Sequence, residues 1–569
     1  PPDRCEHLVT GPGLRVAVLA KQVRVFGEQE INPYCRRAIA YGVQLARRTA
    51  GTCTVFTMGP PSARDVLAEA LGHGAGFGVH VCDPALAAAD LLVTARALAA
   101  AVAKVGPFDL ILLGSASLDA ETAQLGPHLA GLLDLPFTGA ARQLEVTATS
   151  LEATCEQDDR LVRVGARLPA VVAVAERLCA PAKVPAHARP DPTPAMTVLD
   201  LAMLAGAIPG AASPTAIRPI AAPTATRSGR ILSGPVAAQV SAALAELRRR
   251  GALDGEPPPR PPVAPARPGA VITVLADPYH DELTVELLGA AADIGGTVRL
   301  LCGPGRARRN LAAFGADEIW RWAPHDPGPA AVAAALTRDP APGLLLAPAT
   351  AWGRTVAGRY AAVVGAGLIA DATSVTRAGG TTVATVAGGE VRCETRPTVV
   401  TVGPGVLPMR TSRGAVAVSE RPWDVPPASA DVIVHGYRTV DDYAALTRAA
   451  SVVCVGLGVD DPTDPSIRAL LRVLGAELAA TRKLTDAGVL PRSRQVGVTG
   501  RGVRPRLYVA IGVSGKPHHI AAVAGAGTIL AINSDPEAPI FATADVGIVA
   551  PWQEVVPALV TALSARSAA

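Results

Sequence analysis

Short continuous apolar runs alternate along this chain with longer amphipathic stretches, a pattern typical of parallel α/β folds. In the C-terminal region, the apolar runs at 507–511, 528–532 and 546–550 predict three buried strands. The segment 519–526 is short enough to form a crossover helix between two parallel strands. The loops beside these strands carry small, hydroxyl or imidazole side chains, and loops of that kind cradle a dinucleotide.

Two long stretches of the chain repeat one another. RVAVLAKQV at 15–23 parallels AVITVLADP at 270–278, and LILLGSASLDAETAQLGPHLAGLL at 110–133 parallels LLLAPATAWGRTVAGRYAAVVG at 344–365. Each stretch opens as strand, helix, strand, helix, strand, helix, which predicts a parallel α/β unit. An internal duplication is the simplest explanation of the two copies.

A proline-rich segment separates the two copies. Seven of the twelve residues from Pro257 to Pro268 are proline. In a polyproline II conformation the segment spans about 35–40 Å, enough to carry the chain across a neighbouring domain. Before it, residues 235–251 have helical apolar spacing and end in three arginines and a glycine, which favours a helix stop.

Composition narrows the class of protein. The chain has 569 residues, 49% of them hydrophobic, which predicts three or four domains. A net charge of +4 without a basic block, together with 3% aromatic residues, argues against nucleic-acid binding. The nine cysteines include no CxxC pair, so we expect no metal site and no disulfide framework. No signal peptide and no apolar run of membrane-spanning length is found, which predicts a cytoplasmic protein without an integral membrane segment.

Four C-terminal motifs carry a resemblance to a known family. QVGVTG at 495–500, GVSGKPHH at 512–519, AINSDPEAPIF at 531–541 and ADVGIV at 544–549 resemble, in order and spacing, the FAD domain of the electron transfer flavoprotein alpha subunit. This match runs without a gap from Arg482 onward.

The rest of the chain resembles the other parts of the same family. VAVLAKQV at 16–23 and MGPPSARDVLAEALGHGA at 58–75 are similar to the beta subunit. VGAGLIADATSV at 364–375 and GPGVLP at 403–408 are similar to the first alpha domain. The chain is therefore identified as a member of the electron transfer flavoproteins with beta and alpha fused, beta first, a heterodimer-like pair within one chain.

The resemblance implies an α/β fold of three parallel-sheet domains. Two are related, nucleotide-binding-like units of the adenine nucleotide hydrolase type, and the third is a flavodoxin-like or DHS-like FAD-binding domain. The expected boundaries are 1–200 for the beta-like domain, 201–268 for the beta C-terminal arm and linker, 269–430 for the first alpha domain and 431–569 for the FAD domain. Helix 235–251 either crosses to the alpha part as this arm or packs on its own domain.

The resemblance also assigns roles in a predicted FAD site. His519 stands where the family places a cation or hydrogen-bond donor for the negative charge that flavin gains at N1 and O2 on reduction. Arg482 stands where the family places a cation over the isoalloxazine ring, and Thr499 where a hydroxyl approaches flavin N5. The other residues of the predicted FAD site are Thr481, Val498, Gly500, Ser514, Gly515, Lys516, His518, Asn533, Asp535, Gly456 and Gly458.

Several of these positions depart from the family pattern. Val498 and His518 each replace a glutamine, and Leu457 replaces the arginine of a Gly-Arg-Gly motif. A ribityl amide contact and a pyrophosphate arginine are therefore missing. Lys516 replaces an alanine, and we expect its charge to compensate at the phosphates.

A second nucleotide site is expected in the beta-like half. The loop 114–127 reads GSASLDAETAQLGP, and its TAQLGP is closer to bifurcating relatives with a second FAD than to ordinary carriers, which bind AMP there. Arg36, however, replaces an acid of the nearby family motif. AMP, a second FAD and a degenerate site all stay open. The residues predicted for this site are Asn32, Asp119, Thr122, Ala123, Gln124, Leu125 and Gly126.

The predicted function is electron carriage rather than stand-alone catalysis. A partner dehydrogenase is expected to reduce the FAD, and a quinone-linked oxidoreductase or another acceptor to receive the electrons. Residues 178–181, LCAP, replace the family's recognition loop, which argues against an acyl-CoA dehydrogenase as donor. The alternatives are an NADH-oxidising, electron-bifurcating flavoprotein with two FADs and a redox-inactive nucleotide-binding scaffold.

Overall fold

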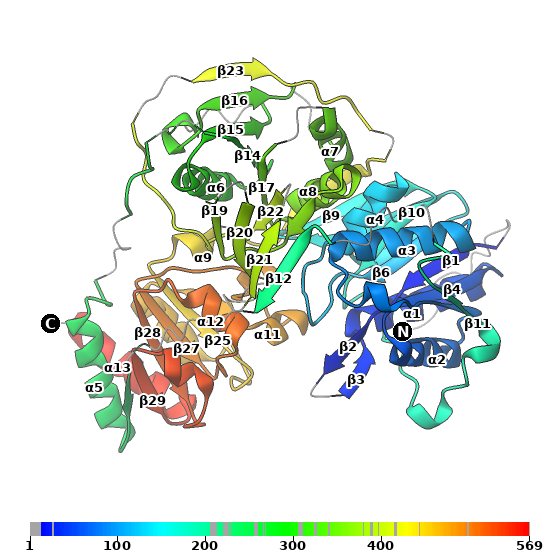
Figure 1. The fold of residues 1–569 in the computed structure, drawn as a ribbon. Helices are drawn as coiled ribbons and strands as arrows, with labels where there is room; N and C mark the ends of the chain where they lie inside the picture. The colour runs from blue at the N-terminus through cyan, green and yellow to red at the C-terminus, as the bar shows by residue number, and fades with distance from the viewer. Residues whose placement is uncertain are drawn as a thin grey trace.

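A computed structural model describes most of the chain (Figure 1). The residues outside the description are 1–12, 26–27, 205–212, 220–226, 228, 255–259, 266, 268, 305–310, 324–326, 339–341, 379–380, 387–390, 396–397, 415–417, 429, 443, 498–499 and 568–569.

The N-terminal half contains a ten-stranded sheet with helices on both faces. In order across the sheet, the strands are β11 (Met196–Leu199), β5 (Phe77–Val81), β4 (Thr52–Met58), β1 (Arg15–Leu19), β6 (Leu110–Gly114), β10 (Ala170–Val174), β7 (Phe137–Val146), β8 (Ser150–Gln157), β9 (Arg160–Arg167) and β24 (Ile433–Thr439). The helices are α1 (Pro33–Arg48), α2 (Arg64–His73), α3 (Leu91–Val105) and α4 (Leu125–Leu133). Strands β11 to β7 run parallel, and β7, β8, β9 and β24 pair antiparallel.

The central strands of this sheet are buried on both faces, which explains their continuous apolar runs. In β1, Val16 and Val18 lie in the core beneath α1 and α2, whereas Ala17 and Leu19 lie in the core beneath α3 and α4. A small hairpin of β2 (Gln22–Val25) and β3 (Glu28–Ile31) follows β1.

A second unit repeats this arrangement. Its seven parallel strands are β18 (Gly367–Ile369), β22 (Thr398–Val402), β17 (Leu344–Pro348), β14 (Val271–Leu275), β15 (Thr297–Cys302), β16 (Glu318–Arg321) and β23 (Ser419–Pro422). Its helices are α6 (Asp281–Ile294), α7 (Pro329–Arg338) and α8 (Ala351–Val364). The order β16-β15-β14-β17-β22-β18 matches β5-β4-β1-β6-β10-β7 of the first sheet, strand for strand along the chain. The fold therefore agrees with the duplication that the sequence predicts.

A third, six-stranded parallel sheet lies in the C-terminal region. Its strands are β13 (Arg230–Leu232), β29 (Val546–Val549), β28 (Thr528–Asn533), β27 (Leu507–Ile511), β25 (Ser451–Val455) and β26 (Glu477–Ala480). Its helices are α9 (Ala445–Arg448), α10 (Pro465–Leu474), α11 (Arg482–Asp486), α12 (Pro517–Val523) and α13 (Trp552–Ser567). The three strands predicted from apolar runs are present. The predicted crossover helix is also present, and it ends at Val523. It begins two residues earlier than predicted, because Pro517 is suited to the first turn of a helix.

Short strands join the three units to one another. β12 (Thr215–Pro219) pairs antiparallel with β21 (Val391–Thr395), which continues into β20 (Thr381–Val386) and β19 (Ser374–Ala378). β13 pairs with β29, and β24 pairs with β9 although residues 168–432 lie between them in the chain. These exchanges tie each unit to a segment from another part of the chain.

The helix at the end of the N-terminal half, α5 (Val236–Arg249), packs on the C-terminal sheet. Figure 1 shows it beside α13, and its Val240, Leu244 and Leu247 share a core with β27 to β29. The helix therefore crosses to the C-terminal sheet and does not pack on the N-terminal sheet, as the first of the two interpretations predicts. After α5, the chain returns to the second unit, where Val263 N donates to Thr411 O at 3.0 Å.

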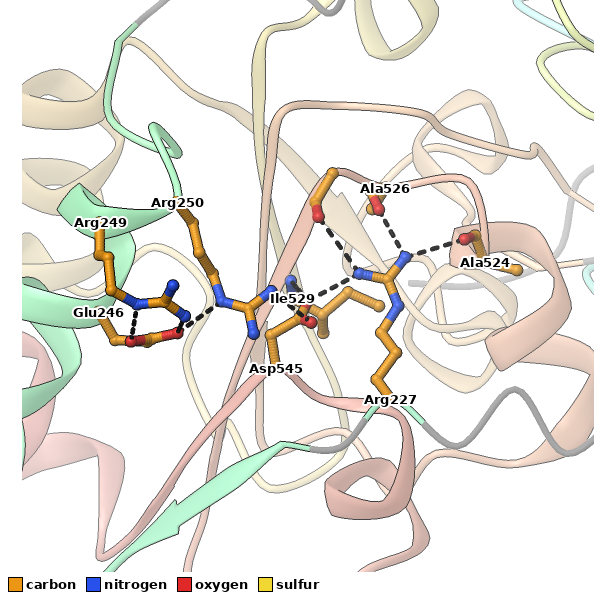
Figure 2. Close-up of polar contacts among 9 residues, drawn as sticks. Arg227, Glu246, Arg249, Arg250, Ala524, Ala526, Ile529 and Asp545 are labelled. Atoms are coloured by element: carbon orange, nitrogen blue, oxygen red, sulfur yellow. Dashed lines mark hydrogen bonds and ion pairs between the residues drawn. The ribbon is translucent and has the colours of Figure 1, made fainter.

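A buried carboxylate fastens the arm to the C-terminal domain (Figure 2). Asp545 lies 2.6 Å from Arg227 Nη1 and 2.9 Å from Arg250 Nη1, and it also accepts a hydrogen bond from Ile529 N at 2.8 Å. Arg227 in turn donates to Ala524 O at 2.9 Å, at the carboxyl end of α12. The arm therefore reaches the helix that carries part of the predicted FAD site.

A histidine and three aspartates join the N-terminal half to the second unit. The tip of the β8–β9 hairpin brings Asp159 Oδ1 to 3.3 Å from His280 Nε2, while Asp277 Oδ1 lies 2.8 Å from His280 Nδ1. Asp158 accepts a hydrogen bond from Ala351 N at the start of α8 at 3.1 Å. Burial alone would lower the pKa of His280, but hydrogen bonds to Asp159 and Asp277 and the nearby Asp158 raise it to about 9.

This contact predicts a loss of stability in mild alkali. Because the pKa of His280 is raised, its contribution is complete below the unfolded pKa of 6.5 and is lost as the pH rises to about 9. The shift corresponds to about 3 kcal/mol. We expect the urea midpoint to fall between pH 6 and pH 9.5, and we expect His280→Gln to reduce that fall. An equal fall in the variant and the wild type would contradict the assignment.

Candidate functional site

Loops at the carboxyl ends of β25 and β27 meet backbone to backbone. Gly456 and Gly458 follow β25, and their N–H groups donate to Ile511 O at 2.9 Å and to Gly512 O at 3.2 Å. A Cβ at Gly456 would lie 2.3 Å from Gly512 O, and Gly512 itself has φ +61°. Only glycine allows these two loops to approach so closely. Leu457, between the two glycines, is exposed.

The loop before α12 has the same character. Gly515 has φ +83°, and a Cβ there would lie 2.2 Å from Ile540 N. Ser514 and Lys516 on either side of it are exposed, and Ser514 O accepts a hydrogen bond from Ile540 N at 3.1 Å. Lys516 is the N-cap of α12 and makes no side-chain cap. The loop thus presents a lysine and backbone beside a helix start, as the sequence predicts for a phosphate.

Asn533 ends β28 and shapes the adjacent turn. Its Nδ2 donates to Val513 O at 3.0 Å, which joins it to the loop after β27. Its Oδ1 accepts from Asp535 N at 3.0 Å, and Asp535 accepts from Glu537 N at 3.0 Å. In this structure both side chains stabilise a turn, so their predicted contact with the adenosine end stays a prediction.

His519 lies in the interior of the C-terminal domain. Its Nδ1 is 3.2 Å from Val496 O and its Nε2 is 2.8 Å from the Tyr508 hydroxyl. Burial lowers its pKa to about 4, so the ring is neutral at pH 7. A carbonyl only accepts, so Nδ1 carries the proton and Nε2 accepts from Tyr508. The role that the resemblance assigns to His519 stays a prediction, and it requires the ring to exchange one of these partners.

Arg482 starts α11 and points at the N-terminal half. Its guanidinium pairs with Glu121 and the Tyr34 hydroxyl, and its Nε lies 3.1 Å from Asp486 Oδ2. Burial alone would lower the pKa of Arg482, but the neighbouring Tyr34, Glu121 and Asp486 raise it above its ordinary value. Thr481 is the N-cap of this helix without a side-chain cap. Arg482 is therefore a permanent cation at the boundary between two parts of the chain.

Two predicted residues of the FAD site, Val498 and Thr499, lie outside the described residues, and nothing is described of the His518 side chain. The neighbouring Gly500 is described, and a Cβ there would lie 2.3 Å from Gln495 O. The turn at 495–501 therefore also depends on a glycine.

The predicted second nucleotide loop follows β6 and is fixed by polar contacts. Asn32 donates to Ala116 O at 2.7 Å and accepts from Leu118 N at 3.2 Å. Asp119 lies 2.6 Å from Lys21 Nζ. Burial alone would raise the pKa of Asp119, but hydrogen bonding and the Lys21 charge lower it. Lys21, which follows β1, and Asn32, which is the N-cap of α1, therefore fix the position of this loop.

The second part of this loop has an unusual backbone and unsatisfied polar groups. Glu121 and Ala123, which are the direct neighbours of Thr122, have φ +51° and +52°. The left-handed region costs a residue with a Cβ about 1–2 kcal/mol. Gln124 is fully buried, and neither atom of its amide group has a hydrogen-bond partner among the described residues. Leu125 and Gly126, also predicted for the site, open α4 directly after it.

Three residues beside these loops were not predicted from the sequence. Tyr34 and Glu121 contact Arg482 across 448 and 361 positions of chain, and Tyr508 holds His519. Such pairings leave no periodic signal. The nearest sequence clue was the position of Tyr34 and Glu121 within motifs already assigned to the second nucleotide.

Two family models match the chain. The model of the electron transfer flavoprotein domain matches residues 23–201 and 280–427, which together make up more than half of the sequence. The chain belongs to the electron transfer flavoprotein family. The model of the electron transfer flavoprotein FAD-binding domain matches residues 445–524, which include the loops around Gly456 and Gly515. The family places the protein in electron transport, with FAD as the group bound by its C-terminal domain.

Curated relatives match a smaller part of the chain. The electron transfer flavoprotein alpha subunit of Mycobacterium leprae is 37% identical over 241 residues, which cover 41% of this chain and 76% of that subunit. Protein FixB of Bradyrhizobium diazoefficiens is 37% identical over 240 residues, covering 40% of this chain and 64% of FixB. Protein FixB of Azotobacter vinelandii is 33% identical over 295 residues, covering 47% of this chain and 81% of FixB. Each relative corresponds to less than half of this electron transfer flavoprotein.

The residues present at the loops fit the pyrophosphate of FAD. The glycines at 456, 512 and 515 stand where a Cβ would collide with neighbouring backbone, so they allow these loops to pack closely on one another and on Ile540. Lys516 supplies a positive charge beside them. No helix among the described residues of this flavoprotein combines the length and apolar character needed to cross a membrane.

The Gly515 loop gives a test of this site. Gly515→Ala adds a collision with Ile540 to the cost of a positive φ, and we expect the C-terminal domain to lose about 2–4 kcal/mol together with flavin binding. Gly475→Ala is the matched control, because Gly475 has φ +56° and nothing within 4 Å of its Cβ position. Urea unfolding and flavin absorbance measure both variants. Equal losses in the two would show that the close approach at Gly515 is unimportant.

Proposed function

We propose that this chain is a beta-alpha fusion that carries electrons through one FAD in its C-terminal domain. The observation that supports it most is the order of matches: the electron transfer flavoprotein domain model fits twice, and the FAD-binding domain model follows. The equal strand order in the first two sheets supports the same conclusion. The domains proposed are 1–200, 201–268, 269–430 and 431–569, with β24 contributed by the last of them to the first sheet.

The proposed FAD site lies at the carboxyl ends of β25, β27 and β28. Gly456, Gly515 and Lys516 would hold the pyrophosphate, since the Gly456 loop contacts the loop that leads into α12, where Lys516 adds a positive charge. Arg482 would supply a fixed cation for the isoalloxazine ring. FAD supplies reversible one- and two-electron transfer, and these residues bind it and set the charge around it.

The proposed donor is a partner dehydrogenase, and the proposed acceptor is a quinone-linked oxidoreductase or another redox protein. The mycobacterial relative is named for electron transfer, which agrees with a carrier. A second nucleotide is proposed in the loop that contains Asp119, Thr122 and Gln124. Its TAQLGP sequence favours an occupied site, with AMP or FAD as occupant.

The bifurcating function is the second candidate, and the same TAQLGP loop favours it. A bifurcating protein binds two FADs and is bleached by NADH, whereas a simple carrier binds one FAD and is not. Counting the flavins released per chain therefore separates the two candidates.

Denaturing extraction and chromatography of the released nucleotides test this proposal. We expect one FAD and a second nucleotide per wild-type chain, and AMP as that nucleotide would favour the simple carrier whereas a second FAD would favour bifurcation. We expect Lys516→Ala to lower FAD occupancy about tenfold after dialysis, since it removes a phosphate contact. Lys104→Ala, an exposed lysine of α3, serves as control and is expected to keep its FAD. A colourless protein that also fails to take up added FAD would contradict the proposal.

The proposed fusion predicts that the chain still assembles when it is divided into two polypeptides. Separate chains ending and beginning within 255–259 are expected to copurify when coexpressed, because β13, α5 and β24 join the parts without that covalent link. Gel filtration with absorbance at flavin wavelengths measures the complex. Two fragments that elute separately, each folded by circular dichroism, would rule out the subunit-like division.

A further inference from the structure

Arg482 is bound from outside its own domain. Its Nη1 pairs with Glu121 and its Nη2 with the Tyr34 hydroxyl, both in the N-terminal half, while Asp486 binds it from its own helix. The guanidinium also lies 5.6 Å from the centre of the Tyr34 ring. Among the described residues, Glu121 and Tyr34 are thus polar partners of this cation that come from the other half.

The partner Glu121 is part of the second nucleotide loop. The loop is fixed upstream by Asn32 and by the ion pair of Asp119 with Lys21. Glu121 itself has φ +51°, so its backbone is held in a costly conformation while its side chain is 14% exposed and paired with Arg482. A ligand bound in this loop would therefore contact the segment that contains Glu121, and Glu121 pairs with Arg482.

Tyr34 links the same two places by a second route. It is in the first turn of α1, two residues after Asn32, which holds the loop. Burial raises the pKa of Tyr34, although Arg482 opposes that rise, so the hydroxyl stays protonated at neutral pH. The Tyr34 oxygen thus accepts a hydrogen bond from Arg482 without neutralising its charge.

Arg177 and Glu176 are further charged side chains of the N-terminal half near α11. Arg177 of the N-terminal half donates to Thr485 O at 3.0 Å, and its Nη1 lies 3.3 Å from Glu156 Oε1. Burial raises the pKa of Glu176, with the nearby Asp486 adding to the effect. Among the described residues, the carboxylate that joins Arg482 across the two halves is that of Glu121.

We propose that Glu121 and Tyr34 are positioning residues for Arg482, through which the second nucleotide loop sets the charge beside the flavin. The inference rests on the proposed function, because Arg482 acts on flavin only if FAD binds in the C-terminal domain. Glu121 offsets part of the Arg482 charge, and a less offset cation favours the more negative, reduced flavin. A change of occupancy in the loop that moves Glu121 therefore changes the flavin potential.

The test uses the full-length FAD protein, with AMP as the probe because AMP is the adenosine phosphate part of both candidate nucleotides. The second nucleotide is first removed by dialysis, and the flavin midpoint potential is measured with and without AMP. We expect AMP to shift the wild-type potential and to leave that of Glu121→Gln unchanged. Glu121→Gln should also have a more positive potential than wild type in the absence of AMP.

The matched control is Asp486→Asn. It removes a carboxylate from the same guanidinium, but from within the same helix as Arg482. We expect its potential to rise as well, yet to keep the AMP shift. Loss of the AMP shift in Asp486→Asn, its persistence in Glu121→Gln, or its absence in the wild type would overturn the proposal.

A second measurement needs no flavin. In FAD-stripped protein, amide hydrogen exchange of peptides covering 482–486 is expected to speed up about tenfold in Glu121→Gln and less in Tyr34→Phe. Added AMP is expected to slow this exchange in the wild type only. Unchanged exchange in Glu121→Gln would overturn the link even if FAD binds. If the protein never binds FAD but Glu121→Gln and AMP change the exchange of 482–486 as expected, the proposed function is contradicted and the link between the loop and α11 is supported.

Discussion

One buried carboxylate, Asp545, and the two arginines that reach it fasten the crossing arm to the C-terminal domain. Asp545 is 6% exposed and lies between Arg227 and Arg250, which flank the strand and helix of the crossing arm. Loss of Asp545 would deprive both arginines of this partner, whereas loss of one arginine would leave Asp545 paired with the other. The same carboxylate accepts from Ile529 N at the start of β28, so it connects the arm to the sheet that carries the site loops.

The duplicated units contribute a second level of organisation. Helices α4 and α8, which occupy equivalent positions in the two copies, pack on each other, and Gly358 of α8 allows Gln124 and His128 to approach. Arg359 of α8 donates to Ala130 O at 3.3 Å near the end of α4. The contact between the copies is thus built from the same element on both sides, as in a two-fold symmetric dimer.

Much of the fold could be predicted from local pattern. The runs 507–511 and 529–532 are almost continuously apolar because both faces of a parallel sheet are covered, and the repeat of 110–133 at 344–365 indicated the duplication. The partner of α5 could not be predicted, because apolar spacing shows that a helix face is buried but not against what. The same holds for β24, whose seven residues are all exposed and give no strand signal, although backbone pairing with β9 holds it.

The glycines that the loop geometry requires could be predicted from the sequence, whereas the long-range contacts of the candidate site could not. The loops at Gly456 and Gly515 agree with the family motif, since their backbone geometry excludes other residues. The neutral state of His519 follows from burial and from Tyr508, which a sequence motif does not contain. The pairing of Arg482 with Glu121 depends on how two domains meet, which neither motif encodes.

The return of the chain after the arm gives the C-terminal domain a mechanical limit. Arg506 of that domain lies 3.9 Å from Asp254, and seven residues further on Pro261 O accepts a hydrogen bond from Thr411 N in the second unit at 2.9 Å. Seven residues span at most about 25 Å when fully extended. As long as both attachments hold, the two points cannot separate further than this. The length of chain between them therefore sets an upper limit on any rotation of the flavin domain relative to the second unit.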